Sequence, residues 1–255
     1  MIREELDNQL ITYKCRTCTS INIVKNGTNR LGQQQYLCKD CGARRVLVSK
    51  REEQAKKKQE LIPLALAACF ERVSLRGVAR LFNISRSTLM DEFIEYFAAL
   101  PTLSETLLPA EPDDILEWDE AWSFVGYKKN KQWLWTVLCR RTRQIIGFEI
   151  GDRSQQTCQR LWDKIPEAYR QGFHFSDFWS AYRNVLPTNQ HEAVGKESGE
   201  TSHQERWYNT LRQWCGRYTR KTLSFSKCEI HHRWFTECFI IQYNLRIKYQ
   251  MMSLT

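Results

Sequence analysis

Two matched cysteine pairs near the start of the chain constrain its fold more than any other feature. Cys15 and Cys18 form one C-x-x-C pair, Cys38 and Cys41 form the second, and nineteen residues separate the pairs. Each pair places two thiolates on one side of a tight turn, so the two pairs can surround one tetrahedral zinc ion. The alternative is four unrelated buried thiols. We expect residues 1–50 to form a small zinc-ribbon or zinc-finger module with a structural Zn²⁺.

The composition indicates a cytoplasmic protein. The 255 residues are enough for one sizeable core and one or two small modules. No apolar run reaches transmembrane length, and the opening residues MIREE lead into a polar stretch, so we expect no membrane partner. The remaining cysteines are scattered singly, as is typical of reduced thiols: Cys69, Cys139, Cys158, Cys215, Cys228 and Cys238.

The net charge of +9 is unevenly distributed along the chain. Residues 1–60 carry 13 basic against 7 acidic side chains, a balance of +6, and residues 206–255 carry 9 against 2, a balance of +7. Residues 61–205 carry 16 against 20, a balance of −4. Two basic ends around an acidic middle indicate a bound polyanion and a central metal site, although solvated basic faces are the simpler alternative.

Short strands and a charged helix are expected in the first quarter of the chain. The pattern predicts strands over 36–38 and 45–48, and Asn26 followed by Gly27 is a turn signal. Residues 49–60 are charged and helix-prone, so they predict a linker helix.

Residues 74–90 have the pattern of a helix-turn-helix within a helical module over 51–100. Asn83 tolerates the left-handed turn conformation, Ile84 fills the angle between two helices, and Ser85 can cap the second helix. A plain helical hairpin in a bundle is the alternative. The expected DNA contacts are Arg76 on the first helix and the opening residues of the second, Arg86, Ser87 and Thr88.

The rest of the chain reads as an α/β domain over 113–255. Three prolines in 101–112 predict a linker before it. Strands are expected over 115–125, 132–139, 144–150, 173–176 and 191–194, and helices over 155–165, 179–185, 203–216 and 229–249. Three strands joined by short hairpins, then a helix, a strand and further helices, is an α/β order.

Three acidic residues stand out as candidate catalytic ligands. Asp119 lies inside an apolar strand, where a carboxylate costs free energy unless it meets a cation, and Asp177 directly follows another strand. Glu205, Asn209 and Arg212 share one helical face at spacings of four and three. Converging carboxylates suit two Mg²⁺ ions that act in phosphoryl transfer, and the Asn and Arg are candidate phosphate contacts.

Other acidic residues remain alternatives as metal ligands. All three candidates can instead be ordinary salt-bridge partners, and other acids nearby are Asp113, Asp114, Glu117, Glu120 and Glu192. Glu117 falls on the same strand face as Asp119 and is a candidate for a supporting role. His203 lies two residues before Glu205 and is a weaker candidate for approaching a scissile phosphate.

These motifs together resemble the IS-one (IS1) family of bacterial insertion-sequence transposases over nearly the whole chain. The cysteine module and the helix-turn-helix occur in the order that the family has. The most specific matches lie in the second half: Trp118-Asp119-Glu120, Gly151-Asp-Arg-Ser154, Ser176-Asp177-Phe-Trp-Ser-Ala-Tyr182, Glu205-Arg206, Asn209 and Leu211-Arg212.

The resemblance implies a ribonuclease-H-like catalytic domain with a DDE triad at Asp119, Asp177 and Glu205. It implies Mg²⁺-dependent (or Mn²⁺-dependent) cutting of transposon ends and strand transfer into target DNA by a nucleoid-associated enzyme. Its partners would be double-stranded DNA and at least a second copy of the chain on that DNA, with no small-molecule substrate. For the third carboxylate, Glu200, Glu197 and Glu192 remain alternatives to Glu205.

Two other classes of protein share some of these features. One is a non-catalytic regulator that binds DNA through zinc and helix-turn-helix modules; an intact acidic triad argues against it. The other is a metal-dependent nuclease that hydrolyses DNA without joining strands. Products of strand joining would separate the nuclease from the transposase.

Overall fold

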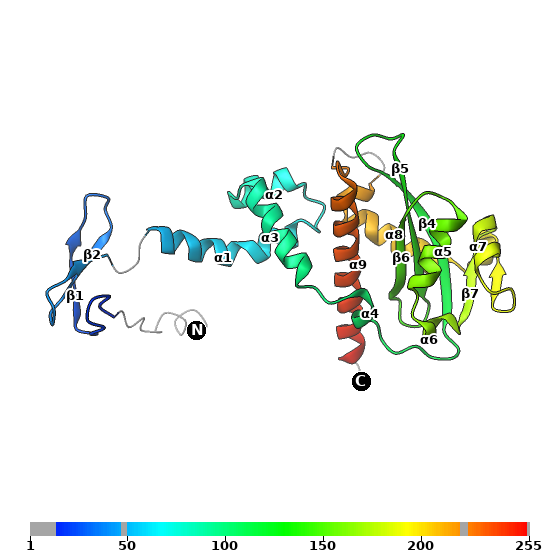
Figure 1. The fold of residues 1–255 in the computed structure, drawn as a ribbon, viewed down its shortest axis with the longest axis horizontal. Coiled ribbons are helices and arrows are strands. Elements are labelled where there is room, and N and C mark those ends of the chain that lie inside the picture. The colour runs from blue at the N-terminus through cyan, green and yellow to red at the C-terminus, as the bar shows by residue number, and fades with distance from the viewer. Residues whose placement is uncertain (1–13, 47–49, 220–223, 254–255) are drawn as a thin grey trace. The chain divides into compact units, whose positions relative to one another are not determined.

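The computed structural model describes residues 14–46, 50–219 and 224–253 (Figure 1). The chain divides into two compact units, residues 1–61 and 62–255. None of the helices in the described ranges combines the length and the apolar content needed to cross a membrane.

The first unit contains a three-stranded antiparallel sheet in the order β1-β2-β3. Its strands are β1 (Ile23–Thr28), β2 (Gln34–Cys38) and β3 (Arg44–Arg45). The strand expected over 36–38 lies within β2, and the one expected over 45–48 overlaps β3 at Arg45, while residues 47 and 48 fall outside the described ranges. Helix α1 (Lys50–Ala68) covers most of the predicted linker helix and continues into the second unit.

The turn predicted at Asn26 and Gly27 was wrong, because both residues lie inside β1. The pairing of β1 with β2 shifts register between Lys25 and Thr28, and Gly27 has a φ of +67°. The left-handed conformation that glycine allows is used here for a bulge in the strand, not for its reversal. The chain reverses over residues 29–33 instead, where the Asn29 N–H donates to the carbonyl of residue 33.

Helices α2 (Leu75–Phe82) and α3 (Arg86–Ala98) each begin at a capping serine, of which Ser85 was predicted from the sequence. The Ser74 hydroxyl accepts the N–H of Gly77 at 3.0 Å, and the Ser85 hydroxyl accepts that of Thr88 at 3.0 Å. Between the helices Asn83 takes the left-handed conformation, with a φ of +52°. The turn conformation predicted at Asn83 and the cap predicted at Ser85 are therefore confirmed.

A five-stranded mixed sheet forms the centre of the second unit, in the order β6-β5-β4-β7-β8. Strands β4, β5 and β6 are antiparallel neighbours, whereas β7 runs parallel to β4 and β8 runs parallel to β7. The strands are β4 (Ile115–Phe124), β5 (Lys131–Cys139), β6 (Ile145–Gly151), β7 (Phe173–Ser176) and β8 (His191–Ala193). Each expected strand of the α/β domain is present, with its ends within one residue of the prediction.

Helices cover both faces of this sheet (Figure 1). The α5 and α7 side packs on Trp118 and Trp135, and the α8 and α9 side packs on Ala121 and Leu134, as the alternation of a strand requires. The helices of this part are α4 (Leu103–Thr106), α5 (Gln155–Lys164), α6 (Glu167–Arg170), α7 (Ser180–Val185), α8 (Ser202–Trp214) and α9 (Glu229–Met252). Two 3₁₀ turns span Lys196–Ser198 and Gly216–Tyr218.

The helical pair α2–α3 and the mixed sheet share one hydrophobic core. Phe93 of α3 stacks on Phe235 of α9 with ring centroids 4.0 Å apart, and Phe70 lies against both rings. The proline-containing linker 101–112 therefore joins parts of one compact unit. The division into separate modules over 51–100 and 113–255 stays a prediction.

We expect the stability of the second unit to fall as the pH drops from 7 to 5, partly through His174. This ring is fully buried on β7, its Nδ1 accepts the indole N–H of Trp118 at 3.0 Å, and burial lowers its pKa to about 4. In the unfolded chain the ring takes up a proton near pH 6.5, so the unfolded state binds more protons over this range and is favoured.

The contribution of His174 should be roughly 2 kcal/mol between pH 7 and 5. His174→Gln should lose that part of the pH dependence in urea unfolding, whereas His231→Gln, on α9, should keep it. Parallel stability curves for the wild type and His174→Gln would contradict this assignment.

Candidate functional site

The four cysteines of the two pairs are gathered in one cluster. Their Sγ atoms all lie within 4.8 Å of one another, with 3.6 Å between Cys15 and Cys41 and 3.6 Å between Cys18 and Cys38. A tetrahedral site with zinc–sulfur bonds near 2.3 Å has sulfur–sulfur edges of about 3.8 Å, so the spacing fits a zinc ion. None of the ten cysteines, all within the described ranges, forms a disulfide.

Backbone groups shape both cysteine turns. The N–H groups of Cys18 and Thr17 donate to the Cys15 sulfur and lower the pKa of that thiol to about 6, which favours the thiolate that a metal binds. In the second turn the N–H of Gly42 donates to the carbonyl of Cys38 at 2.9 Å, and Gly42 has a φ of +72°. The cluster could therefore bind a metal ion through two similar knuckles.

The pairing of β4 with β7 sets two predicted acids beside each other. The parallel register pairs Glu117 with Phe175, and two residues further along the strands come Asp119 and Asp177. Asp177 directly follows the last residue of β7, and its Oδ1 accepts the N–H of Trp179 at 2.9 Å. The two carboxylates therefore belong to neighbouring strands at the same level of the sheet.

Hydrogen bonds from α8 to the sheet bring the third predicted acid to this level. The Tyr208 hydroxyl donates to the backbone carbonyl of Asp119 at 2.7 Å and lies 2.7 Å from the Thr136 hydroxyl. The Gln204 side chain donates to the same Thr136 hydroxyl at 2.5 Å. Glu205 precedes Tyr208 by three residues, so the two side chains leave the same side of the helix.

The three acids affect one another electrostatically. Burial raises the pKa of Asp119 to about 7, with further contributions from the negative charges of Glu120, Asp177 and Glu205. The Asp119 carboxylate accepts the N–H of Glu120 at 2.8 Å. In the described part of the chain no lysine or arginine forms an ion pair with Asp119 or Glu205. The site therefore concentrates negative charge that its own cations do not balance.

Unlike Asp119, the fully buried carboxylates of the second unit form ion pairs. Each has a cationic partner: Asp114 has Arg141 at 2.7 Å, Glu117 has Arg140 at 2.9 Å, Glu120 has Arg153, and Glu149 has Arg233 at 2.7 Å. Asp119 and Glu205 have no ion-pair partner in the described ranges, and Asp177 has only Arg153 at 3.9 Å, so these carboxylate oxygens suit a hard divalent ion such as Mg²⁺ or Mn²⁺. Across the described ranges, the cysteines are nevertheless the one group already close enough to share a single ion.

Glu117 holds the start of α8. Its carboxylate accepts the N–H groups of His203 and Gln204 at 3.0 and 3.1 Å, and it also bonds the His203 ring at 2.6 Å and Arg140 at 2.9 Å. Arg140 continues to the Glu200 carboxylate at 2.7 Å. Glu117 therefore supports the site by holding the start of α8, a role that the sequence left open. The side chains of His203 and Glu200 are used in bonds to Glu117 and Arg140.

Arg153 is a site residue that the argument from sequence chemistry missed. Its guanidinium lies between two indole rings, 4.0 Å from the centroid of Trp179 and 4.9 Å from that of Trp133. It pairs with Glu120 and lies 3.9 Å from the Asp177 carboxylate. The Gly151–Ser154 motif of the family resemblance contained this residue and was the available signal.

The outer face of α8 carries the predicted polar pair beside Glu205. Arg212 donates to the side-chain oxygen of Asn209 at 3.5 Å, and Asn209 and Glu205 are exposed. The rival acids are differently placed: Glu192 is exposed on β8, and Glu197 is exposed in the 3₁₀ turn before α8.

A basic groove of about 830 Å³ lies along the starts of α2 and α3. It is lined by the predicted DNA contacts Arg76, Arg86 and Ser87, and by Lys227 and His231 from the chain before and within α9. None of its lining residues in the described ranges is acidic. Thr88, the remaining predicted contact, bonds the Ser85 hydroxyl at 2.9 Å. The groove is therefore suited to a polyanion.

Comparisons with known proteins agree on one family. Residues 115–244 match the profile of the family described as IS1 transposase, which is half of the chain. The chain is 36% identical to the insertion element iso-IS1n protein InsB of Shigella dysenteriae over 120 residues, covering 47% of this chain and 88% of that protein. It is 32% identical to the insertion element IS1 protein InsB of Shigella flexneri over 134 residues, covering 52% and 95% of the two chains.

We expect Glu117→Gln to destabilise the second unit by about 3 kcal/mol, because it removes one partner of a buried ion pair and weakens the cap of α8. Glu200→Gln is the matched control, since it removes the exposed partner of the same arginine and should cost less than about 1 kcal/mol. Urea unfolding of the two variants measures the difference. Equal losses would show that Glu117 does not anchor the helix.

Proposed function

Because the chain belongs to the IS1 transposase family, we propose that it is a DNA transposase that binds the terminal inverted repeats of an insertion sequence and catalyses Mg²⁺-dependent cleavage and strand transfer. The catalytic part is supported mainly by Asp119, which has no cationic partner in the described structure and whose pKa is raised by burial and by the negative charges of Glu120, Asp177 and Glu205. These three residues are the proposed catalytic triad. As a DNA-acting enzyme, it would work in the cytoplasm at the nucleoid.

The topology of the second unit supports a ribonuclease-H-like assignment for the catalytic domain. Three antiparallel hairpin strands are followed by two parallel strands, with helices on both faces of the sheet. Asp119 lies on the central strand, Asp177 at the carboxyl end of its parallel neighbour, and Glu205 on a helix that packs against them. In the proposed site, three distant parts of the sequence would together hold the metal ion.

In the proposed reaction the carboxylates hold the metal and α8 guides the substrate. Mg²⁺ or Mn²⁺ bound by these oxygens would supply the Lewis acidity for in-line displacement at phosphorus, first by water and then by a DNA 3′ hydroxyl. Asp119 stays fixed in the centre of the sheet, while Asn209 and Arg212 donate to the phosphates of the strand. No covalent link between protein and DNA is required.

DNA recognition is assigned to the first unit and to the α2–α3 pair. The cysteine cluster, with a structural Zn²⁺, stabilises a small basic module, and α3 would act as the recognition helix of a helix-turn-helix. The proposed contacts are Arg76, Arg86, Ser87 and Thr88, of which three line the basic groove. Joining two ends requires at least a dimer on the DNA.

The triad is tested by cleavage and strand transfer on the element's own terminal DNA with Mg²⁺. Asp119→Asn, Asp177→Asn and Glu205→Gln should each lose at least roughly 100-fold in rate while still binding the DNA, because each removes a charge from the metal site. Asp163→Asn, an exposed acid on α5, should act like the wild type.

The same assay distinguishes the alternatives. Retained activity in Glu205→Gln would exclude this residue and direct the search to Glu200, Glu197 and Glu192. Cleavage without joining would identify a nuclease. Binding by a folded wild type without cleavage would favour a non-catalytic regulator.

Cys38→Ser should lower the zinc content from one ion per chain to none and weaken binding to the terminal DNA, because four thiolates hold the ion. The second unit should keep its urea-unfolding transition, since the cluster lies in the first unit. Cys228→Ser, outside the cluster, is the control and should keep its zinc. Unchanged zinc content in Cys38→Ser would refute the four-cysteine site.

A further inference from the structure

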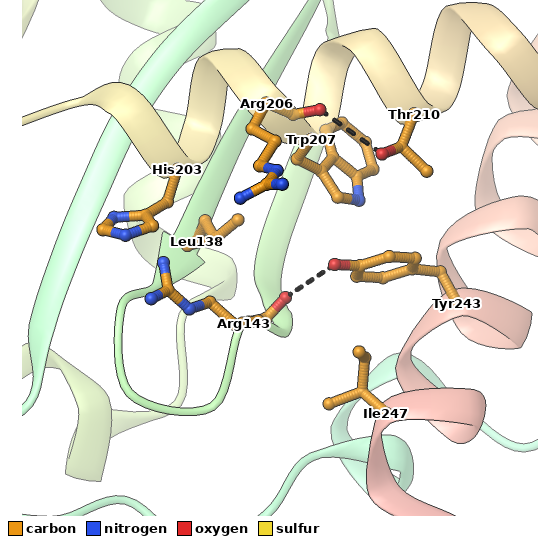
Figure 2. A pocket seen from close by; sticks show the side chains of 8 residues that line it. All are labelled: Leu138, Arg143, His203, Arg206, Trp207, Thr210, Tyr243 and Ile247. Atoms are coloured by element: carbon orange, nitrogen blue, oxygen red, sulfur yellow. Dashed lines mark hydrogen bonds between the residues drawn. The ribbon is translucent and has the colours of Figure 1, made fainter. Parts of the chain in front are cut away.

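A second pocket lies along α8, the helix that carries Glu205. It has a volume of about 340 Å³ and is formed by α8, the turn between β5 and β6, and α9 (Figure 2). Its polar lining comes from Arg143, His203 and Arg206, and its apolar lining includes Trp207 and Tyr243. No acidic side chain lines it within the described ranges. A pocket of this composition offers hydrogen-bond donors next to aromatic side chains.

The indole N–H of Trp207 has no partner. Only 2% of the residue is exposed, and its Nε1 is buried without a hydrogen-bond acceptor in the described structure. Figure 2 shows this nitrogen facing the open space between α8 and Tyr243. Leaving a buried donor unpaired costs free energy, so the position is suited to a ligand that supplies an acceptor.

The two arginines of the pocket are free to bind an anion. Neither the Arg143 nor the Arg206 guanidinium has an ion pair or a hydrogen bond within the described ranges; Figure 2 shows the Arg143 guanidinium beside the His203 ring and the Arg206 guanidinium between His203 and Trp207. Arg143 also has a φ of +62°, a left-handed conformation that glycine or asparagine adopts with less strain. The hydroxyl of Tyr243 donates to the Arg143 carbonyl at 3.2 Å and helps to hold this turn against α9.

The position of the pocket relates it to the proposed chemistry. Arg206 directly follows Glu205 on α8, and the His203 ring bonds Glu117 at 2.6 Å. The pocket and the proposed triad therefore both use side chains from the first turns of α8.

We propose that this pocket binds one nucleotide of the DNA strand, with its phosphate between Arg143 and Arg206 and its sugar or base against Trp207 and Tyr243. Two guanidinium groups and an indole N–H match the acceptor oxygens of a phosphate, and the volume leaves room for more than that group. Aromatic side chains stack on nucleobases without a requirement for sequence. The proposal rests on the proposed function only in taking DNA, and not a free nucleotide, as the source of the ligand.

The test uses thymidine 3′,5′-bisphosphate as the probe and NMR of the indole N–H groups in the full-length protein as the readout. Trp207→Phe identifies the Trp207 signal by its loss. The nucleotide should shift this signal, and inorganic phosphate at the same concentration should shift it less. Arg143→Gln and Arg206→Gln should each weaken nucleotide binding at least tenfold, whereas Lys129→Gln, which removes one exposed charge elsewhere, should leave it within twofold.

A Trp207 signal that does not respond, or equal weakening in Lys129→Gln, would overturn the proposal. To identify the source of the ligand, a single-stranded oligonucleotide should compete with the bisphosphate and shift the same signal; a failure to compete would exclude DNA. These outcomes are independent of cleavage. Active enzyme with no response at Trp207 refutes the pocket alone, whereas an inactive enzyme with the full response refutes the proposed function alone.

Discussion

The attachment of α8 to β4 is the interaction on which the proposed catalytic site depends. Glu117 binds the first N–H groups of the helix, and Tyr208 binds the backbone carbonyl of Asp119 one turn later. Both contacts come from the strand that carries the first acid, so the position of Glu205 is set relative to Asp119 with little freedom. Loosening either end of this attachment would separate the acids without changing any of them.

Charge balance distinguishes the site from the rest of the core. The fully buried carboxylates of the second unit have arginine or lysine partners, which offset the free-energy cost of removing a charge from water. Asp119 lacks such a partner, and burial together with the negative charges of Glu120, Asp177 and Glu205 raises its pKa to about 7, so a bound cation would favour its carboxylate form. Arg153, fixed between two indoles, balances Glu120 and stays within 3.9 Å of Asp177.

Local sequence patterns predicted the helices and strands, but they did not predict the contacts between distant segments. The cap at Ser85, the left-handed Asn83 and the strands of the sheet follow from nearest neighbours in sequence, and the structure confirms them. The Asn-Gly signal failed because the same left-handed glycine serves a turn or a bulge, and pairing with β2 decides which. The roles of Glu117 and Arg153 depend on segments 86 and 33 residues away, which no local pattern shows.

Mapping the metal site with iron tests most directly whether Asp119, Asp177 and Glu205 hold a divalent ion. Fe²⁺ replaces Mg²⁺ at oxygen sites, and with ascorbate and peroxide it cleaves the protein backbone next to the bound ion. We expect cuts beside Asp119, Asp177 and Glu205 in the full-length protein, suppressed by excess Mg²⁺ and lost in Asp119→Asn. Cuts confined to other acids, such as Glu192 or Glu149, or cuts that persist in Asp119→Asn, would contradict it.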